Sequence, residues 1–278
     1  MTTSTNGSEQ SQISTSRIAV LIPVFNQLGD LLRTLNSVDS ETADFEFFVV
    51  DDGSSPAIDL SGHEFIHPVN LIGLSPNRGC AFARNAGLEQ IVAKGFDYVA
   101  LQDAGDIDVG ERMAIQANFL DQNPALGVVG SWGEYVDMEG NHLYVHKPPS
   151  ENQDIRARMP FSSAFIHPAC MVRVSALKTI GFYNTSYPNT SDYELLYRLT
   201  RKFESANLQK VLIKKENNPA SLSLGKRRRG LVLRLRTQLM YFRFLSLGSY
   251  LGVMQTLAFI VIPYRFVLAI KERKGYAN

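Results

Sequence analysis

Phe45-Glu46-Phe47-Phe48-Val49-Val50-Asp51-Asp52-Gly53-Ser54 is an apolar run that ends on two carboxylates and a glycine. Its β-prone residues from Phe47 to Val50 are too few for a buried helix and predict a strand covered on both faces, as in a parallel sheet. Ligands of open α/β sheets bind outside the carboxyl ends of the strands. Asp51 and Asp52 are therefore expected to face a crevice, as partners for hydroxyl groups, a base edge or a divalent metal. For this segment alone, a solvated turn is the alternative.

Comparable segments lie on both sides of this strand. They predict a strand from Ile18 to Ile22 ended by Pro23, a helix carrying Leu28, Leu31, Leu32 and Leu35, a strand from Leu71 to Leu74, a helix opened by Asn77-Arg78-Gly79, and a strand from Tyr98 to Leu101. The last strand also ends in acid, at Gln102-Asp103-Ala104-Gly105-Asp106. Strands that alternate with helices predict a parallel, doubly wound sheet with Asp51, Asp52, Asp103 and Asp106 along one edge.

Composition places the 278-residue chain among ordinary folded proteins, with 45% hydrophobic and 20% charged residues. The charge is divided unevenly: residues 1–200 hold 12 Lys and Arg against 24 Asp and Glu, and residues 201–278 hold 16 against 3. A basic tail on an acidic body suggests an anionic partner. Two cysteines are too few for a disulfide framework, and the start lacks the apolar core of a signal peptide, so we expect a cytoplasmic protein.

In their order, these segments resemble the family 2 glycosyltransferases, inverting enzymes of the GT-A fold that use nucleotide sugars. The resemblance covers about residues 17–223. It rests on Ile22-Pro23-Val24-Phe25-Asn26, Val49-Val50-Asp51-Asp52-Gly53-Ser54, Asn77-Arg78-Gly79 with Arg84-Asn85, Gln102-Asp103-Ala104-Gly105-Asp106, and Ser191-Asp192-Tyr193-Glu194-Leu195. It implies an α/β fold with a Rossmann-like, mostly parallel sheet flanked by helices, followed in this chain by a C-terminal helical extension.

The resemblance also implies a donor site and a catalytic base. The donor-binding residues would be Pro23, Phe25, Asn26, Asp51, Asp52, Asn77, Arg78, Arg84 and Asp103. Asp52 would take the base or the ribose, and Asp192 would take the proton of the acceptor hydroxyl. Asp192 is also expected to open a helix, whose N-terminus keeps a carboxylate ionised. By itself a plain N-cap is the simpler interpretation of Asp192, and its position after the donor motifs favours catalysis.

A departing nucleoside diphosphate gains negative charge, which a Mg²⁺ or Mn²⁺ ion held by carboxylates and phosphate oxygens stabilises. Asp103 and Asp106 are the expected metal ligands. The family usually has a further Asp where this chain has Gly105, so the metal site is atypical. Arg227 to Arg229 are the alternative source of positive charge, and a capped turn is the alternative for the two aspartates.

Residues on the acceptor side are less sharply indicated. His167, Arg227 and Arg228 are expected to contact the acceptor or the donor phosphates. For His167, a satisfied core histidine is an equally supported interpretation. The predicted organisation is a disordered start (residues 1–16), a nucleotide-sugar-binding half (17–130), an acceptor-binding half with the catalytic base (131–225) and a basic, apolar tail (226–278).

The tail combines arginines with apolar residues at helical spacing. An apolar stripe of Leu231, Val232, Leu235, Leu239 and Phe242 is bordered by Arg227, Arg229, Arg234, Arg236 and Arg243, and an uncharged run follows from Phe244 to Tyr264. Arginines beside an apolar face suit a helix lying among lipid headgroups. An interfacial or re-entrant anchor is the favoured interpretation, and a packed helix pair and a membrane span are the alternatives. This aliphatic and aromatic content fits an anionic membrane surface better than nucleic acid.

These features predict an inverting hexosyltransferase. It would move a sugar from a nucleotide-diphosphate sugar to a hydroxyl of a glycan or lipid-linked glycan, in cell-surface polysaccharide synthesis at the inner face of the cell membrane. The alternative is a catalytically silent homologue that binds sugar nucleotides, which Gly105 suggests and Asp192 opposes. A response-regulator receiver also has paired acids at a strand end, but here a full β-α unit precedes them.

Overall fold

The computed structural model describes residues 16–38, 43–216 and 224–262, with the side chains of 224–227 excepted. The strands are β1 (Ile18–Val24), β2 (Phe45–Asp51), β3 (Val69–Gly73), β4 (Tyr98–Leu101), β5 (Ile107–Asp108), β6 (Leu126–Val136), β7 (His142–His146), β8 (Met171–Arg173) and β9 (Glu204–Glu216). The α-helices are α1 (Leu28–Leu35), α2 (Cys80–Ala93), α3 (Arg112–Gln122), α4 (Asn152–Arg158), α5 (Val174–Ile180), α6 (Ser191–Lys202), α7 (Leu224–Met240) and α8 (Leu247–Val261). All but the last residue of the expected disordered start (residues 1–16) lie outside the described residues.

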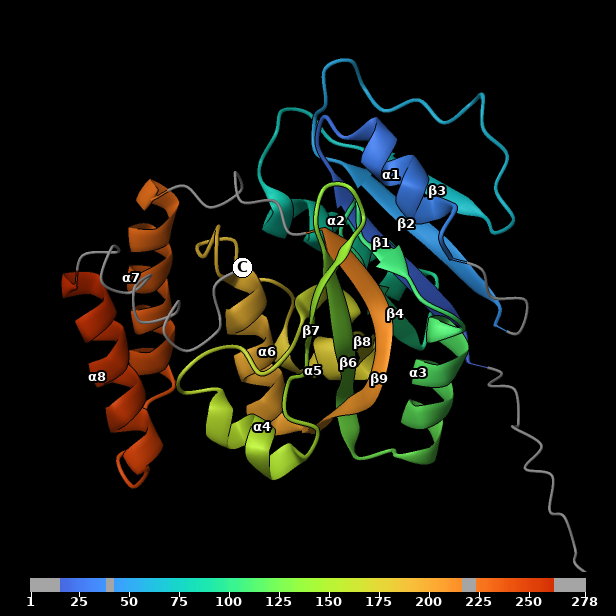
Figure 1. Ribbon diagram of the computed structural model, residues 1–278. Helices are drawn as coiled ribbons and strands as arrows, with labels where there is room; N and C mark the ends of the chain where they lie inside the picture. The colour runs from blue at the N-terminus through green and yellow to red at the C-terminus, as the bar shows by residue number, and fades with distance from the viewer. Residues whose placement is uncertain (1–15, 39–42, 217–223, 263–278) are drawn as a thin grey trace, which may run out of the picture.

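One mixed sheet runs through the molecule in the order β3-β2-β1-β4-β8-β6-β9-β5, with β7 paired to β6 (Figure 1). The strands β3, β2, β1 and β4 run parallel to one another, which is the predicted doubly wound half. The second half is mixed, because β8 is antiparallel to β4 and β6 while β6 is parallel to β9. The carboxyl ends of β1, β2 and β4 therefore share one edge, as the sequence predicted.

Pro23 lies inside β1 and does not end it. The Leu21 carbonyl accepts a hydrogen bond from Gln102 N on the β4 side, whereas the Val24 carbonyl accepts one from Asp52 N on the β2 side. Because the backbone groups of successive residues face opposite neighbours, the nitrogen of Pro23 faces β4, as the carbonyl of Leu21 does. The pairing of β4 with β1 ends at Leu21, so β4 offers no partner there. No ladder hydrogen bond is lost there, so the strand tolerates the proline.

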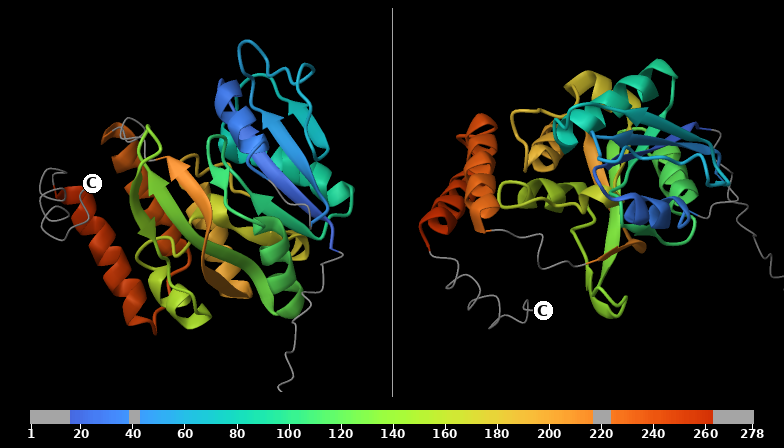
Figure 2. Two further views of the ribbon diagram at one scale, coloured as in Figure 1. Left: turned by 45° about the vertical axis from the view of Figure 1, so that its right-hand side comes forward. Right: turned by 90° about the horizontal axis from the view of Figure 1, so that it is seen from above.

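Two apolar clusters cover the two faces of the sheet. On one face, alternate residues of β1 and β2 such as Leu21 and Phe48 pack against α2, α5 and α6. On the other, Val20 and Phe47 pack against α1 and α3. Helices on both faces explain why these strands are continuous apolar runs (Figure 2).

The C-terminal helices α7 and α8 form a pair at one end of the molecule, beside α6 and α4 (Figures 1 and 2). Gln238 Nε2 on α7 donates to the Pro160 carbonyl at 2.6 Å, and the Tyr241 hydroxyl donates to Glu194 Oε1 at 2.8 Å. Gly252 on α8 lies so close to the Pro160 carbonyl oxygen that a Cβ at this position would be 2.1 Å from it. The helical extension is thus attached to the α/β body through specific contacts.

Candidate active site

The turn after β2 is held by Asp51, whose two oxygens accept backbone N–H groups. Oδ1 accepts from Ser54 N at 2.9 Å and Oδ2 from Ile58 N at 3.0 Å. The turn also needs Gly53, which has φ 79° and lies so close to Asn77 that a Cβ would be 2.8 Å from its backbone nitrogen. Asp51 therefore shapes the edge of the site, and its predicted contact with the donor stays a prediction.

Asp52 anchors the loop that leads into α2. Its Oδ1 accepts from Arg78 N at 3.0 Å, and its Oδ2 accepts from Gly79 N at 2.7 Å. The residue is buried, so the carboxylate is fixed between the two segments. A base or ribose bound to Asp52 would use the remaining lone pairs of these oxygens.

Three predicted donor-binding residues are exposed around this turn. Asn26 joins the ends of β1 and β2, since its N–H donates to Ser54 Oγ at 2.8 Å and its Oδ1 accepts from Ser55 N at 2.8 Å. Phe25 beside it is exposed, as an aromatic ring that stacks on a base must be. The Arg78 guanidinium lies over the Phe82 ring, 3.2 Å from its centroid.

Charged side chains from three elements meet at the acidic end of β4. Arg84 Nη2 on α2 donates to Asp103 Oδ1 at 2.7 Å. Lys215 Nζ on β9 donates to both oxygens of Asp106, at 2.9 and 2.7 Å, and lies 3.8 Å from Asp103 Oδ2. Burial alone would raise the pKa of Asp103, but Arg84 and Lys215 hold it at about 2. We call these four residues, the aspartates Asp103 and Asp106 with their cationic partners Arg84 and Lys215, the acidic cluster.

The backbone explains why Gly105 stands where the family usually has an acid. Gly105 has φ 100°, a conformation that L side chains rarely adopt, and its N–H donates to Thr34 Oγ1 at 2.8 Å. An aspartate here would be strained. The glycine at position 105 is thus explained by the conformation of this turn.

Arg112, the first residue of α3, supports the acidic cluster from a buried position. This fully buried arginine pairs with Asp108 Oδ1 at 2.6 Å and also donates to Gln102 Oε1. Gln102 Nε2 in turn donates to the Asp106 carbonyl at 3.1 Å. The buried arginine therefore fixes the strand end that carries Asp103 and Asp106.

His167 lies beside the acidic cluster as a buried, hydrogen-bonded side chain. Its Nε2 is 2.9 Å from the Tyr183 hydroxyl. Burial, together with the neighbouring Arg84, lowers the pKa of His167 to about 3, so the ring is neutral at neutral pH. These contacts favour the core-histidine interpretation. Arg228 is exposed near the start of α7, and the side chain of Arg227 lies outside the described residues.

Asp192 is the second residue of α6, as predicted for a residue that opens this helix. Burial raises its pKa, with opposing effects from the Tyr193 N–H and Arg84 and a further increase from Asp103. Asp192 also lines a cavity of about 290 Å³ together with Ser162, Ser163, Asn189, Thr190, Tyr193, Gly230, Leu231 and Arg234. Asp192 is thus near enough to Arg84 and Asp103 for their charges to affect its pKa, and it also lines a separate cavity to which α7 contributes Gly230, Leu231 and Arg234.

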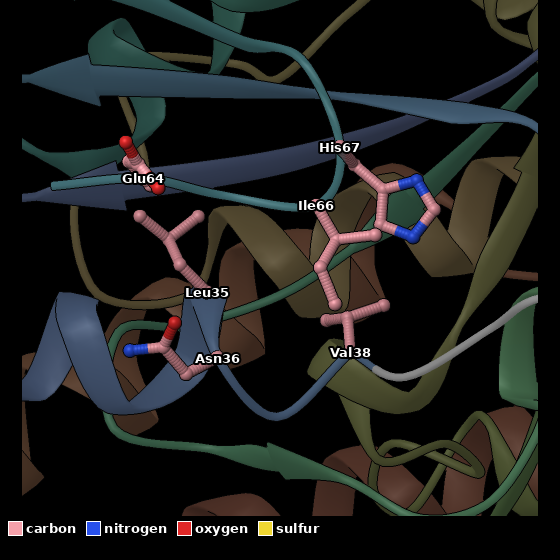
Figure 3. A pocket seen from close by; sticks show the side chains of 6 residues that line it. All are labelled: Leu35, Asn36, Val38, Glu64, Ile66 and His67. Atoms are coloured by element: carbon pink, nitrogen blue, oxygen red, sulfur yellow. The ribbon is translucent and has the colours of Figure 1, made fainter.

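A second cavity, of about 240 Å³, lies far from these residues. Leu35, Val38 and Ile66 give it an apolar lining, with Asn36, Glu64 and His67 around them (Figure 3). The His67 ring contacts Phe45 at the beginning of β2 at a tilt of 31°, with ring centroids 3.6 Å apart. This cavity is at the amino end of the parallel strands and contains no predicted site residue.

The two predicted metal ligands, Asp103 and Asp106, differ in exposure and in whether their oxygens are already paired. Among the described residues, no group of three or more His, Cys, Asp or Glu side chains is arranged to hold a metal. Asp106 is almost fully buried and has both oxygens on Lys215, whereas the Asp103 side chain is 35% exposed. Magnesium is commonly held by one or two carboxylates together with substrate phosphates. Asp103 fits that role, and Asp106 does not.

The chain belongs to glycosyl transferase family 2, whose profile matches residues 19–181. This match ends before α6 and so does not include Asp192. An uncharacterized glycosyltransferase of Rickettsia prowazekii is 26% identical over 203 residues, which are 71% of this chain and 63% of that protein. An uncharacterized glycosyltransferase of Haemophilus influenzae is 30% identical over 130 residues, 45% of this chain and 50% of that protein. The chain thus spans less than two thirds of these curated relatives.

Solved structures share the fold. S. aureus TarS 1-349 in complex with UDP-GlcNAc has a TM-score of 0.65 at 17% identity, covering 87% of this chain and 71% of that one. The mannosyltransferase PcManGT from Pyrobaculum calidifontis, in complex with GDP-Man and Mn²⁺, has a TM-score of 0.57 at 14% identity, covering 95% and 81%. The predicted GT-A fold is confirmed.

Several residues of the site were not anticipated. Lys215, Tyr183 and Arg234 reach the site from distant parts of the chain, whereas Arg112 is only four residues after its partner Asp108. The one sequence signal was the uneven charge, since Lys215 and Arg234 belong to the basic last quarter of the chain. Nothing in that pattern says which cation turns inward.

Proposed function

We propose that this protein is an inverting hexosyltransferase that moves a sugar from a nucleotide-diphosphate sugar to a hydroxyl of a glycan or glycolipid. The observation that carries the proposal is the position of Asp192, which lies near Arg84 and Asp103 of the acidic cluster and lines the cavity. A donor whose diphosphate lies at the acidic cluster would turn its anomeric carbon toward Asp192, and an acceptor would enter through the cavity. Such an arrangement suits a direct displacement.

In the proposed reaction, Asp192 takes the proton of the acceptor hydroxyl while that oxygen bonds to the anomeric carbon. The bond from this carbon to the diphosphate oxygen breaks, and the nucleoside diphosphate leaves with the electron pair. Arg84 and Lys215 would face this charge, but each is already paired with an aspartate, Asp103 or Asp106. A Mg²⁺ or Mn²⁺ ion held by Asp103 would supply the missing positive charge to the leaving group.

The metal proposal predicts a split between two variants. Asp103→Asn is expected to remove the gain in nucleoside diphosphate affinity that Mn²⁺ gives, because the ion loses its protein ligand. Asp52→Ala is expected to weaken binding with or without Mn²⁺, because the Arg78–Gly79 loop loses its anchor. Calorimetric titrations measure both effects, with the exposed Asp154→Asn as the control. An undiminished Mn²⁺ effect in Asp103→Asn would contradict the assignment.

A base with a raised pKa also predicts the pH dependence of transfer. The ionised form of Asp192 is the active one, so the rate should fall as the pH is lowered through its pKa, which burial places above the ordinary value. A pH–rate profile under saturating donor and acceptor measures this limb, and product NMR reports the inverted anomeric configuration. An acidic limb at the ordinary aspartate value of about 3.9 would refute the burial argument.

We also propose that the protein works at the inner, cytoplasmic face of the cell membrane, on acceptors of cell-surface polysaccharide synthesis. None of the helices in the described part of the chain combines the length and apolar character that crossing a membrane requires. Helix α8 buries its small residues Ser249, Gly252 and Thr256 against the protein and exposes Leu247, Tyr250, Leu251, Met254, Leu257 and Val261. Exposed arginines are also present on the neighbouring helix α7 and in the turn that follows it: Arg228, Arg229, Arg236 and Arg243. An apolar face accompanied by arginines fits anionic headgroups.

Vesicle sedimentation tests this surface. Full-length protein is expected to sediment with phosphatidylglycerol vesicles at low salt, since each basic residue near the surface contributes about 1 kcal/mol. Leu251→Glu with Met254→Glu should release it, because both side chains would leave the apolar layer. Ile66→Glu, at a residue 87% exposed on another part of the molecule, is the control. Wild-type protein that stays in the supernatant would contradict the proposal.

A further inference from the structure

Arg234 on α7 lines the cavity beside Asp192, where its side chain is within hydrogen-bonding reach of Tyr193 but has no acidic partner among the described residues. No described residue forms an ion pair with it, and its Nε and Nη2 are buried atoms without a hydrogen bond in the described part of the chain. Burial lowers the pKa of Arg234; the nearby Tyr193 opposes this, and Arg158 adds to it. A partly buried arginine without an acidic partner destabilises the protein unless a bound ligand supplies the missing hydrogen bonds and negative charge.

Two further polar atoms of the same cavity are also unsatisfied. Ser162 Oγ and Thr190 Oγ1 are buried and have no hydrogen-bond partner among the described residues. Native proteins leave few such groups, so three neighbouring side chains with unmet hydrogen bonds in one cavity indicate a ligand. Gly230 and Leu231 form an uncharged part of the lining of this cavity.

We propose that this cavity binds the acceptor through an anionic group, a phosphate or a carboxylate, held by Arg234 next to the hydroxyl that Asp192 deprotonates. The planar guanidinium pairs with either anion through two parallel hydrogen bonds. Ser162 and Thr190 are placed to donate to neutral oxygens of the same unit. At about 290 Å³ the cavity has the size of a small-molecule pocket, enough for one charged sugar unit. This inference rests on the proposed transfer for its use of Asp192.

Three probes of similar size test the inference: methyl glucoside, methyl glucuronide and glucose-6-phosphate, each titrated into the full chain by ligand-observed NMR. We expect at least one anionic probe to bind about ten-fold more tightly than methyl glucoside. Arg234→Gln should remove that preference, and Arg234→Lys should restore part of it. The probe that shows the effect distinguishes a phosphate from a carboxylate.

The exposed Arg229→Gln, on the same helix, is the control and should leave all three affinities unchanged. Arg234→Gln should not lower the melting temperature of the free protein, whereas loss of a structural arginine would. Equal affinities for the three probes, or a preference that survives in Arg234→Gln, would overturn the inference. An anion preference that depends on Arg234, together with unchanged transfer in Asp192→Asn, would instead refute the proposed base and leave the anion site standing.

Discussion

Replacing Asp192 by asparagine is expected to lower the transfer rate by about 10² or more while nucleotide affinity stays within a few-fold of wild type. Asparagine keeps the size of the side chain and its place at the start of α6, but it cannot accept the proton of the acceptor hydroxyl. The loss should therefore appear in kcat, because a general base acts in the transition state more than in donor binding. Transfer of labelled sugar and calorimetry of nucleotide binding measure the two quantities separately.

Asp154→Asn is the matched control, because Asp154 is exposed on α4 and lines neither cavity. It should keep both transfer and binding. Transfer that is equally fast in Asp192→Asn and wild type would reject Asp192 as the base. Nucleotide binding in a wild type that transfers no sugar to any acceptor would favour the catalytically silent homologue.

Arg112→Met is expected to lower the free energy of unfolding by about 3–5 kcal/mol, the usual effect of removing one partner of a buried ion pair. The substitution would leave the buried Asp108 carboxyl, whose pKa burial already raises, without its cationic partner. Gln102 and Gln116 would lose the guanidinium to which they now bond. Because Gln102 also holds the Asp106 carbonyl, the strand end beneath Asp103 should loosen. Urea denaturation followed by circular dichroism measures the change.

A double variant separates the ion pair from the packing around it. Arg112→Met with Asp108→Leu removes both charges and should recover a large part of the lost stability, since replacing a buried pair by apolar residues is often neutral. Arg229→Met, on the surface of α7, should change the stability by less than about 0.5 kcal/mol. An Arg112→Met protein as stable as this control would show that the buried pair contributes nothing.

The parallel half of the fold was predictable from the sequence because its signals are local. Apolar runs such as Phe47 to Val50 indicate strands buried on both faces of a sheet. The acidic residues that follow these runs indicate the carboxyl edge of that sheet. The helix after Gly79 and the helix opened by Ser191 and Asp192 were placed correctly for the same reason. The apolar segment from Phe165 to Arg173 is less regular than its sequence suggests. Only Met171–Arg173 is a strand, after a short 3-10 turn that contains Pro168, which has no N–H to donate.

The environment of the site residues was not predictable, because it depends on contacts between distant segments. Lys215 reaches Asp106 from a strand that lies 109 positions further along the chain. The tail shows the same limit: its arginines were all expected beside a lipid-facing stripe. The structure turns Arg234 inward, since α7 packs on α6, and exposes Arg236. Helical periodicity identifies the stripe but does not say which of its borders meets the rest of the protein.

A thermal-shift screen of the full chain against nucleoside diphosphates, with and without Mn²⁺, tests the donor site most directly. A ligand at a hundred-fold excess over its Kd stabilises a protein by about 2.7 kcal/mol, so binding is readily detected. We expect one nucleoside diphosphate to raise the melting temperature, more strongly with Mn²⁺, and this added effect to vanish in Asp103→Asn. No stabilisation by any nucleoside diphosphate, with or without metal, would contradict a nucleotide-sugar site at the carboxyl ends of β1, β2 and β4.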